Sequence, residues 1–97
     1  MRVAFDWDPV KAAGNVSKHG ISFEEAMTVF RDPLALSIPD LDSQPGEERW
    51  VTIGEAAGGN LLIIVHTWSE TAEGAAVRII SARKPTRNEA RQYREEA

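Results

Sequence analysis

Cysteine is absent from the sequence, and so are several patterns that would mark a particular kind of site. Without Cys there is neither a disulfide framework nor a thiolate nucleophile. The two histidines lie far apart and give no recognisable metal-ligand spacing. Neither a glycine-rich phosphate loop nor a G-x-S-x-G elbow occurs. We therefore expect a protein that uses no metal and no cofactor.

Long apolar runs are also missing. The longest, residues 61–65, is far too short to span a bilayer, and the first residues contain no apolar targeting segment. A chain of 97 residues with 42% apolar composition suits one compact domain. We expect a single domain over residues 1–97, in a soluble and cytoplasmic protein.

Net positive charge is lacking too, because the formal net charge is −4. General attraction to nucleic acid is therefore not expected, and any such binding has to be local. The charge is uneven: residues 1–77 hold five Lys or Arg and twelve Asp or Glu, whereas residues 78–97 hold six and three. This asymmetry predicts an anion-facing end on an acidic protein. The alternative is a solvated strand end followed by a basic last helix.

The first third of the chain predicts a short strand and two helices. Alternating apolar residues over 3–7 indicate the strand. Asp8 as N-cap and Pro9 after it begin a helix that runs to Lys18 and ends at Gly20. Ser22 with Glu25 has the capping-box spacing and begins the second helix. Its apolar face holds Phe23, Ala26, Met27 and Phe30, and Asp32-Pro33 ends it.

The rest predicts a meander of about four strands and a last helix. Strands are expected at 34–38, 49–54, 61–68 and 77–84, separated by a polar loop at 39–47, a turn at 57–60 and a loop at 70–74. Thr86 and Glu89 have the capping-box spacing of a C-terminal helix. The fold class is therefore α+β.

Polar residues that could carry chemistry gather near the ends of the two long strands. Arg78, Arg83 and Lys84 lie on the last strand, and arginine forks match phosphate oxygens. His66 ends the preceding strand, and its ordinary pKa of about 6.5 suits proton transfer, although a hydrogen-bonded structural histidine is the alternative. Trp68 and Tyr93 could stack on unpaired bases.

Two geometric arguments limit how these residues can combine. If the two long strands pair antiparallel, His66 lies near their connecting loop and Arg83 far from it. Arg78 and Arg83 are five apart, so a regular strand directs them to opposite faces. Both can reach one site only if the strand has lost its regularity by Arg83.

The chain resembles the BrnT toxins along almost its whole length. The resemblance rests on Phe5-Asp6-Trp7-Asp8-Pro9, on Lys18-His19-Gly20-Ile21-Ser22-Phe23-Glu24-Glu25-Ala26, and on Arg78-Ile79-Ile80-Ser81-Ala82-Arg83-Lys84. It implies a RelE-like fold and a metal-independent ribonuclease toxin that cleaves RNA and blocks translation. It also implies a BrnA-like antitoxin with a ribbon-helix-helix domain, through which alone the complex contacts operator DNA.

Carried onto this sequence, the resemblance gives each candidate a role. Arg83 and Arg78 contact phosphate, Lys18 and His19 contribute from the helix end, and His66 is the base or acid. Glu48 is a weaker candidate for proton transfer, as is Tyr93. Further RNA contacts come from Lys84, Arg87, Trp68, Arg91 and Tyr93. One departure stands out: Ser69 occupies a position where many relatives carry Arg. The alternative function is a non-catalytic module that binds the antitoxin and assembles a repressor.

Overall fold

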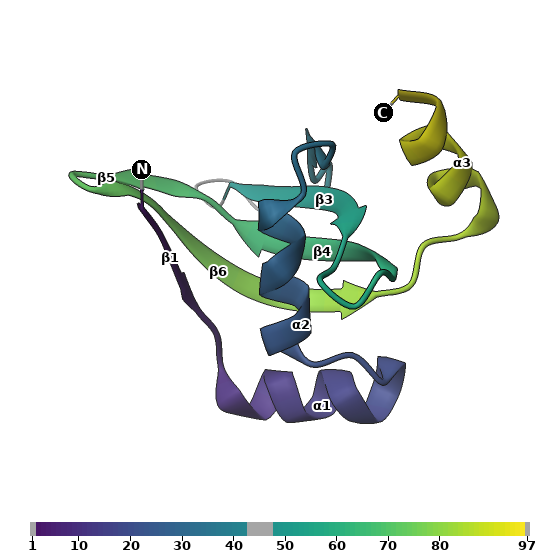
Figure 1. Cartoon of the computed structure of the whole chain (residues 1–97). Helices are drawn as coiled ribbons and strands as arrows, with labels where there is room; N and C mark the ends of the chain where they lie inside the picture. The colour runs from purple at the N-terminus through teal and green to yellow at the C-terminus, as the bar shows by residue number, and fades with distance from the viewer. Residues whose placement is uncertain (1, 43–47, 97) are drawn as a thin grey trace.

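The structure is a computed structural model that describes residues 2–42 and 48–96. Three helices and a six-stranded sheet form the fold, which confirms the predicted α+β class (Figure 1). Residues 43–47, part of the polar loop predicted at 39–47, lie outside the described residues. In chain order the elements are β1 (Arg2–Asp6), α1 (Pro9–His19), α2 (Phe23–Met27), the 3-10 helix η1 (Thr28–Arg31), β2 (Leu36–Pro39), β3 (Arg49–Glu55), β4 (Leu61–Thr67), β5 (Ser69–Thr71), β6 (Gly74–Arg83) and α3 (Arg87–Glu96).

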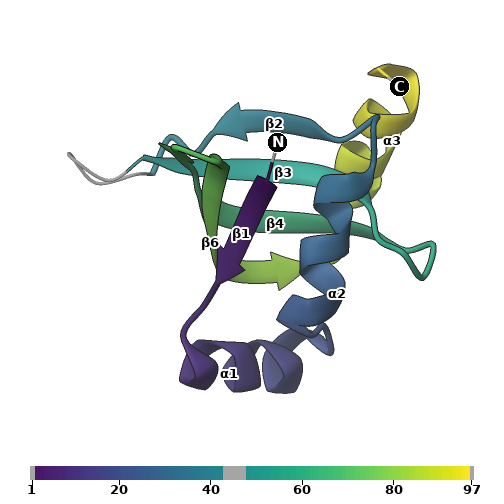
Figure 2. The same ribbon diagram turned by 60° about the vertical axis from the view of Figure 1, so that its left-hand side comes forward.

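The sheet is mixed, with the strand order β1-β6-β4-β3-β2. Strands β2, β3, β4 and β6 form the predicted antiparallel meander, while β1 joins the edge of β6 in parallel. The structure departs from the prediction at 70–74, where a loop was expected. There β5 pairs antiparallel with the start of β6, because the β4–β6 connection is tight enough to continue the ladder. Figure 2 shows β1 beside the first part of β6, with which it pairs in parallel.

Both predicted helix starts in the first third are present. The Asp8 carboxylate accepts a hydrogen bond from the amide of Val10, and Gly20 ends α1 with φ of 72°. The Ser22 hydroxyl accepts from the amide of Glu25. The predicted second helix, however, tightens into η1 at Thr28, whose hydroxyl donates to the carbonyl of Glu25.

The core lies between the sheet and the pair α1 and α2, which cover one face (Figures 1 and 2). We call this the helical face. Its buried side chains come from alternate strand positions, and Met27 and Phe30 pack against them. The fully or almost fully buried members include Phe23, Ala26, Val29, Leu62, Ile64, Val77 and Ile79. The remaining strand positions point to the opposite face, which α3 borders and which we call the open face.

No helix among the described residues is both long and apolar enough to cross a membrane.

Candidate functional site

A β-bulge in β6 decides where the predicted arginines point. Val65 of β4 pairs with Ser81, but the next residue, His66, pairs with Ile79, so Ile80 is an extra residue in β6. The buried positions accordingly change from odd numbers, ending at Ile79, to the even-numbered Ala82. The bulge therefore directs Arg78 and Arg83 to the same open face, about 15 Å apart along the strand.

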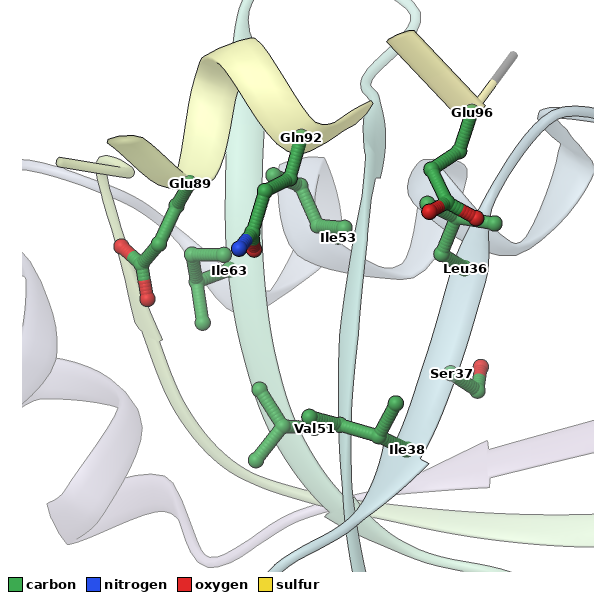
Figure 3. Close-up of a pocket in the computed structure, with 9 residues that line it drawn as sticks. All are labelled: Leu36, Ser37, Ile38, Val51, Ile53, Ile63, Glu89, Gln92 and Glu96. Carbon is green, nitrogen blue, oxygen red and sulfur yellow. The ribbon is translucent and has the colours of Figure 1, made fainter. Parts of the chain in front are cut away.

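The open face forms a groove below α3, of about 490 Å³ (Figure 3). Its floor is apolar and comes from alternate residues of β2, β3 and β4, while α3 contributes a polar wall. The floor residues are Leu36, Ile38, Val51, Ile53 and Ile63, the wall residues are Glu89, Gln92 and Glu96, and Ser37 of β2 also lines the groove. Arg83 reaches this groove because its strand partner is Ile63 and its ion-pair partner is Glu89.

Arg83 holds Glu89 in a two-pronged ion pair. Its two terminal nitrogens lie 2.8 Å and 2.9 Å from the two carboxylate oxygens of Glu89. One of these oxygens also accepts the amide of Thr86, at 2.7 Å, as the predicted capping box requires. Hydrogen bonds from Arg83 are the main reason that the pKa of Glu89 falls to about 2. The carboxylate thus occupies the fork with which an arginine binds phosphate.

Arg78 is also paired, at the other end of the open face. Its Nη1 lies 2.7 Å from Oδ2 of Asp6, its strand neighbour in β1. Both side chains are at least half exposed, so solvent screens this pair and an anion can replace Asp6 easily. Arg49 lies on β3 at the same end of the sheet, with β4 between it and Arg78, and its Nε lies 3.7 Å from Oδ2 of Asp40. Each of these cations already faces a carboxylate.

His66 lies on the helical face, away from Arg78 and Arg83. It is only 2% exposed, and its ring packs edge-on against Phe30 at 4.8 Å. Its Nδ1 lies 2.9 Å from the carbonyl oxygen of Thr67, so Nδ1 carries the proton. Its Nε2 then accepts from the hydroxyl of Thr52 at 2.7 Å. The structure does not bring His66 together with the arginines.

Lys18 and His19 end α1 beside the strand that carries Arg83. Lys18 is exposed and His19 half-buried. Asn15, one turn earlier, is buried and binds both backbone polar groups of Ala82, which fixes this end of α1 to the end of β6. Lys18 and His19 therefore lie near the same strand end, on the helical side of it.

Of the remaining candidates, Lys84, Arg87 and Arg91 are exposed around the start of α3, and Glu48 is exposed just before β3. Tyr93 is only 6% exposed, so its ring is not available for stacking in this structure. Its hydroxyl donates a 2.5 Å hydrogen bond to Asp32. That bond is the main reason that the pKa of Tyr93 rises to about 12. Trp68 lines a second pocket, on the helical face.

Three polar residues that the sequence analysis did not single out position the site. Asn15 is hydrogen-bonded to Ala82 of β6, and Thr52 is hydrogen-bonded to His66. The Asp32 carboxylate accepts hydrogen bonds from the Tyr93 hydroxyl and from the amides of Leu34 and Glu55. Burial raises the pKa of Asp32, but these hydrogen bonds outweigh it and the pKa is lowered. Only the Asp-Pro stop signal pointed to Asp32, and no pattern pointed to Thr52.

Replacing Glu89 by Gln is expected to remove the ion pair that joins α3 to Arg83, while keeping the capping hydrogen bond at the start of α3. Gln can still accept the Thr86 amide, but it cannot neutralise Arg83. We expect a loss of about 1 kcal/mol at neutral pH, discounted because solvent reaches both side chains. The parent holds this stability above pH 4.5 and loses it as the pH falls towards about 2. Urea unfolding at a series of pH values should therefore show the two proteins converging in acid; a constant difference would contradict the ion pair.

His66 makes stability depend on pH between neutral and mildly acidic values, above the range in which Glu89 acts. Burial is the main cause that lowers its pKa, although the hydrogen bond to Thr67 works against it. Below the ordinary pKa of 6.5, His66 binds a proton in the unfolded chain, whereas burial keeps it neutral in the folded chain. The free energy of unfolding therefore decreases as the pH is lowered. Urea midpoints should drop between neutral and mildly acidic pH in the parent, and drop less in His66→Gln. Equal slopes in both would show that another group is responsible.

The metal-ligating side chains show no cluster: within residues 2–42 and 48–96, no group of three or more His, Cys, Asp or Glu could hold a metal ion.

Comparison with known proteins places this geometry in a family. The family model described as the ribonuclease toxin, BrnT, of a type II toxin–antitoxin system matches residues 7–89. Among solved structures, the 1.1 Å crystal structure of the Brucella abortus ribonuclease toxin, BrnT, matches with a TM-score of 0.61 and 21% sequence identity. The alignment covers 90% of this chain and 100% of that one, and at this identity it shows a shared fold. No curated protein matches the chain. Since the family model covers most of the sequence, the chain belongs to the BrnT family of ribonuclease toxins of type II toxin–antitoxin systems.

Proposed function

We propose that this protein is an endoribonuclease toxin whose RNA lies across the open face of the sheet. The observation that carries the proposal is the bulge at Ile80, which gives Arg78 and Arg83 a common face. At about 15 Å apart the two arginines contact different phosphates of one strand rather than the same phosphate. Lys84, Arg87 and Arg91 extend the positive surface beyond Arg83 along the start of α3. RNA binding is then local, as an acidic protein requires.

Arg83 is the residue that we propose to hold the reacting phosphate. Its two terminal nitrogens bind the two carboxylate oxygens of Glu89, and a phosphate that displaces this carboxylate can form the same two-pronged pair with them. Cleavage by the neighbouring ribose hydroxyl builds negative charge on the phosphate, and a fixed guanidinium stabilises that charge more than it stabilises the ground state. Lys18 and His19 approach the same strand end from α1.

The proton transfers need a base for the ribose hydroxyl and an acid for the leaving oxygen. His66 cannot reach a phosphate at Arg83 directly, because it is buried on the helical face with both ring nitrogens hydrogen-bonded. Glu48 is exposed at the start of β3 and His19 lies at the end of α1. His19 is our candidate for direct proton transfer at Arg83, because α1 ends near that end of β6, and no metal takes part. Glu48 precedes β3 at the Arg78 end of the sheet, so it is a weaker candidate and can act only on a phosphate held at that end.

We propose that a type II antitoxin blocks the RNA face in the cell. By the family resemblance, its other end is a ribbon-helix-helix domain, and the complex contacts operator DNA only through it. The whole chain then acts as one RelE-like toxin domain in the cytoplasm, where cleavage of RNA stops translation. An acidic antitoxin segment suits Arg78 and Arg83, because carboxylates already occupy both.

Induction of the protein alone in a bacterial host tests the nuclease. Growth and RNA ends, mapped by primer extension, are followed for the parent, for Arg83→Ala and for the matched control Arg31→Ala, an exposed arginine on η1. We expect arrest and new RNA ends with the parent and with Arg31→Ala. In purified form Arg83→Ala should cleave about 100-fold more slowly. New ends that persist unchanged in Arg83→Ala would remove Arg83 from the site.

The second candidate function is a non-catalytic module that binds the antitoxin and assembles a repressor. The apolar floor of the open-face groove favours it, because Ile38 is 63% exposed and such surfaces often receive a partner. Folded parent protein that accumulates without arrest or new RNA ends, yet binds the antitoxin tightly, would establish this function. Ser69, in place of the arginine of many relatives, would then be the first residue to change back.

A further inference from the structure

A second, smaller pocket lies on the helical face of the sheet, and it shares only Ser37 with the groove below α3. Ser37, Trp50, His66 and Trp68 line it, and its volume is about 280 Å³. Trp50 and His66 are direct strand partners, so their rings share one face. The walls are thus mainly aromatic, with one hydroxyl at the edge.

Three hydrogen bonds determine whether the Ser37 hydroxyl can donate to a ligand or only accept from it. Since Nε2 of His66 is an acceptor, Thr52 donates its only hydroxyl proton to it over 2.7 Å. The Thr52 oxygen lies 2.7 Å from Oγ of Ser37, and because its own proton is used, Ser37 must be the donor there. Thr52 is 1% exposed, so water does not compete for these bonds. Ser37 is therefore left with lone pairs alone to offer a ligand.

We propose that this pocket binds one unpaired nucleobase that carries an amino group, as adenine, cytosine and guanine do. Trp50 and Trp68 offer aromatic surface for stacking, which contributes to affinity in proteins that bind single-stranded nucleic acid. Ser37, an acceptor only, can accept a hydrogen bond from the exocyclic amino group of such a base. A base of about 120 Å³ fits within the pocket volume.

The location connects this pocket to the RNA proposed for the open face, so the inference rests on the proposed function. Trp50 and Trp68 are the chain neighbours of Arg49 and Thr67, and the Thr67 hydroxyl accepts the amide of Arg78. The pocket and Arg78 thus lie at the same end of the sheet, on opposite faces. A strand that leaves Arg78 would turn around this end and place a base between the tryptophans.

Binding can be measured without cleavage by using 2′-O-methyl RNA, which lacks the attacking hydroxyl. Two single-stranded hexamers serve as probes: one of adenosine, and one of purine riboside, which differs only by the missing amino group. We expect the parent to bind the adenosine hexamer about 5-fold more tightly, the worth of one hydrogen bond. In Ser37→Ala the preference should disappear, while the control Ser69→Ala, an exposed serine outside the pocket, should retain it.

Stacking is tested separately with Trp50→Leu, which should weaken both hexamers about 10-fold. Equal affinity of the parent for the two hexamers, or a preference that survives Ser37→Ala, would overturn the proposal. Adenosine monophosphate as a third probe distinguishes the sources of the base. Much weaker binding of the free nucleotide than of the adenosine hexamer assigns the pocket to RNA, and similar binding of both would overturn that assignment. Arg83→Ala should lose cleavage and keep the preference, so failure of the nuclease and failure of the pocket remain distinguishable.

Discussion

Replacing Asn15 by Ala is expected to lower the free energy of unfolding by about 2 to 3 kcal/mol, the net of three lost hydrogen bonds and a small gain in helix propensity. The Asn15 amide donates to the carbonyls of Ile21 and Ala82, both at 2.9 Å, and its oxygen accepts the amide of Ala82 at 3.1 Å. Strand β1 pairs with residues 74–78 of β6, and beyond them the outer edge of β6 has no strand partner among residues 2–42 and 48–96. The side chain of Asn15 instead forms hydrogen bonds with the backbone of Ala82 at this edge.

The loss should reach the site, because Ala82 directly precedes Arg83. We expect urea unfolding of Asn15→Ala to show a lower midpoint, with amide hydrogen exchange faster at Ala82 than in the parent. The matched control is Ser17→Ala, an exposed position of the same helix, where little change is expected. A midpoint like that of the parent would mean that water replaces the side chain without loss.

Replacing Gly74 by Ala is expected to be at least as damaging, with a loss of about 3 kcal/mol or more. Gly74 begins β6 with φ of 151°, a conformation that side chains rarely adopt. A Cβ atom there would lie 2.1 Å from the carbonyl oxygen of Arg2 and 2.7 Å from its nitrogen. Both are backbone atoms, so the clash can be relieved only by moving β1 away from β6.

Thermal unfolding checks this prediction, together with binding of the adenosine hexamer as a probe of local damage. Gly14→Ala is the matched control, since it sits inside α1 and a Cβ atom there would meet nothing within 4 Å. That variant should be more stable than the parent by about 0.5 to 1 kcal/mol. If Gly74→Ala unfolds at the temperature of the parent, β1 does not need its close approach to β6.

Local chemistry in the sequence determined most of the secondary structure. Caps act within one turn of the chain, so Asp8, Ser22 and Thr86 identify helix starts without any knowledge of the fold. Alternation of apolar residues identified the strands for the same reason. The short β5 and the change to a 3-10 turn at Thr28 were missed, because both depend on neighbours from elsewhere in the chain.

Charge in the sequence likewise indicated a basic end, but only the tertiary structure decided what each cation meets. The bulge at Ile80 depends on how β4 and β6 pair, and no residue pattern within β6 predicts it. The pairing of Arg78 with Asp6 joins residues from the two ends of the chain. The burial of His66 and Tyr93 follows from packing against Phe30 and Asp32. Caps and strand periodicity depend on neighbouring residues and can therefore be predicted from the sequence. The face on which a side chain lies, and its partner there, depend on contacts between segments that are far apart in the sequence.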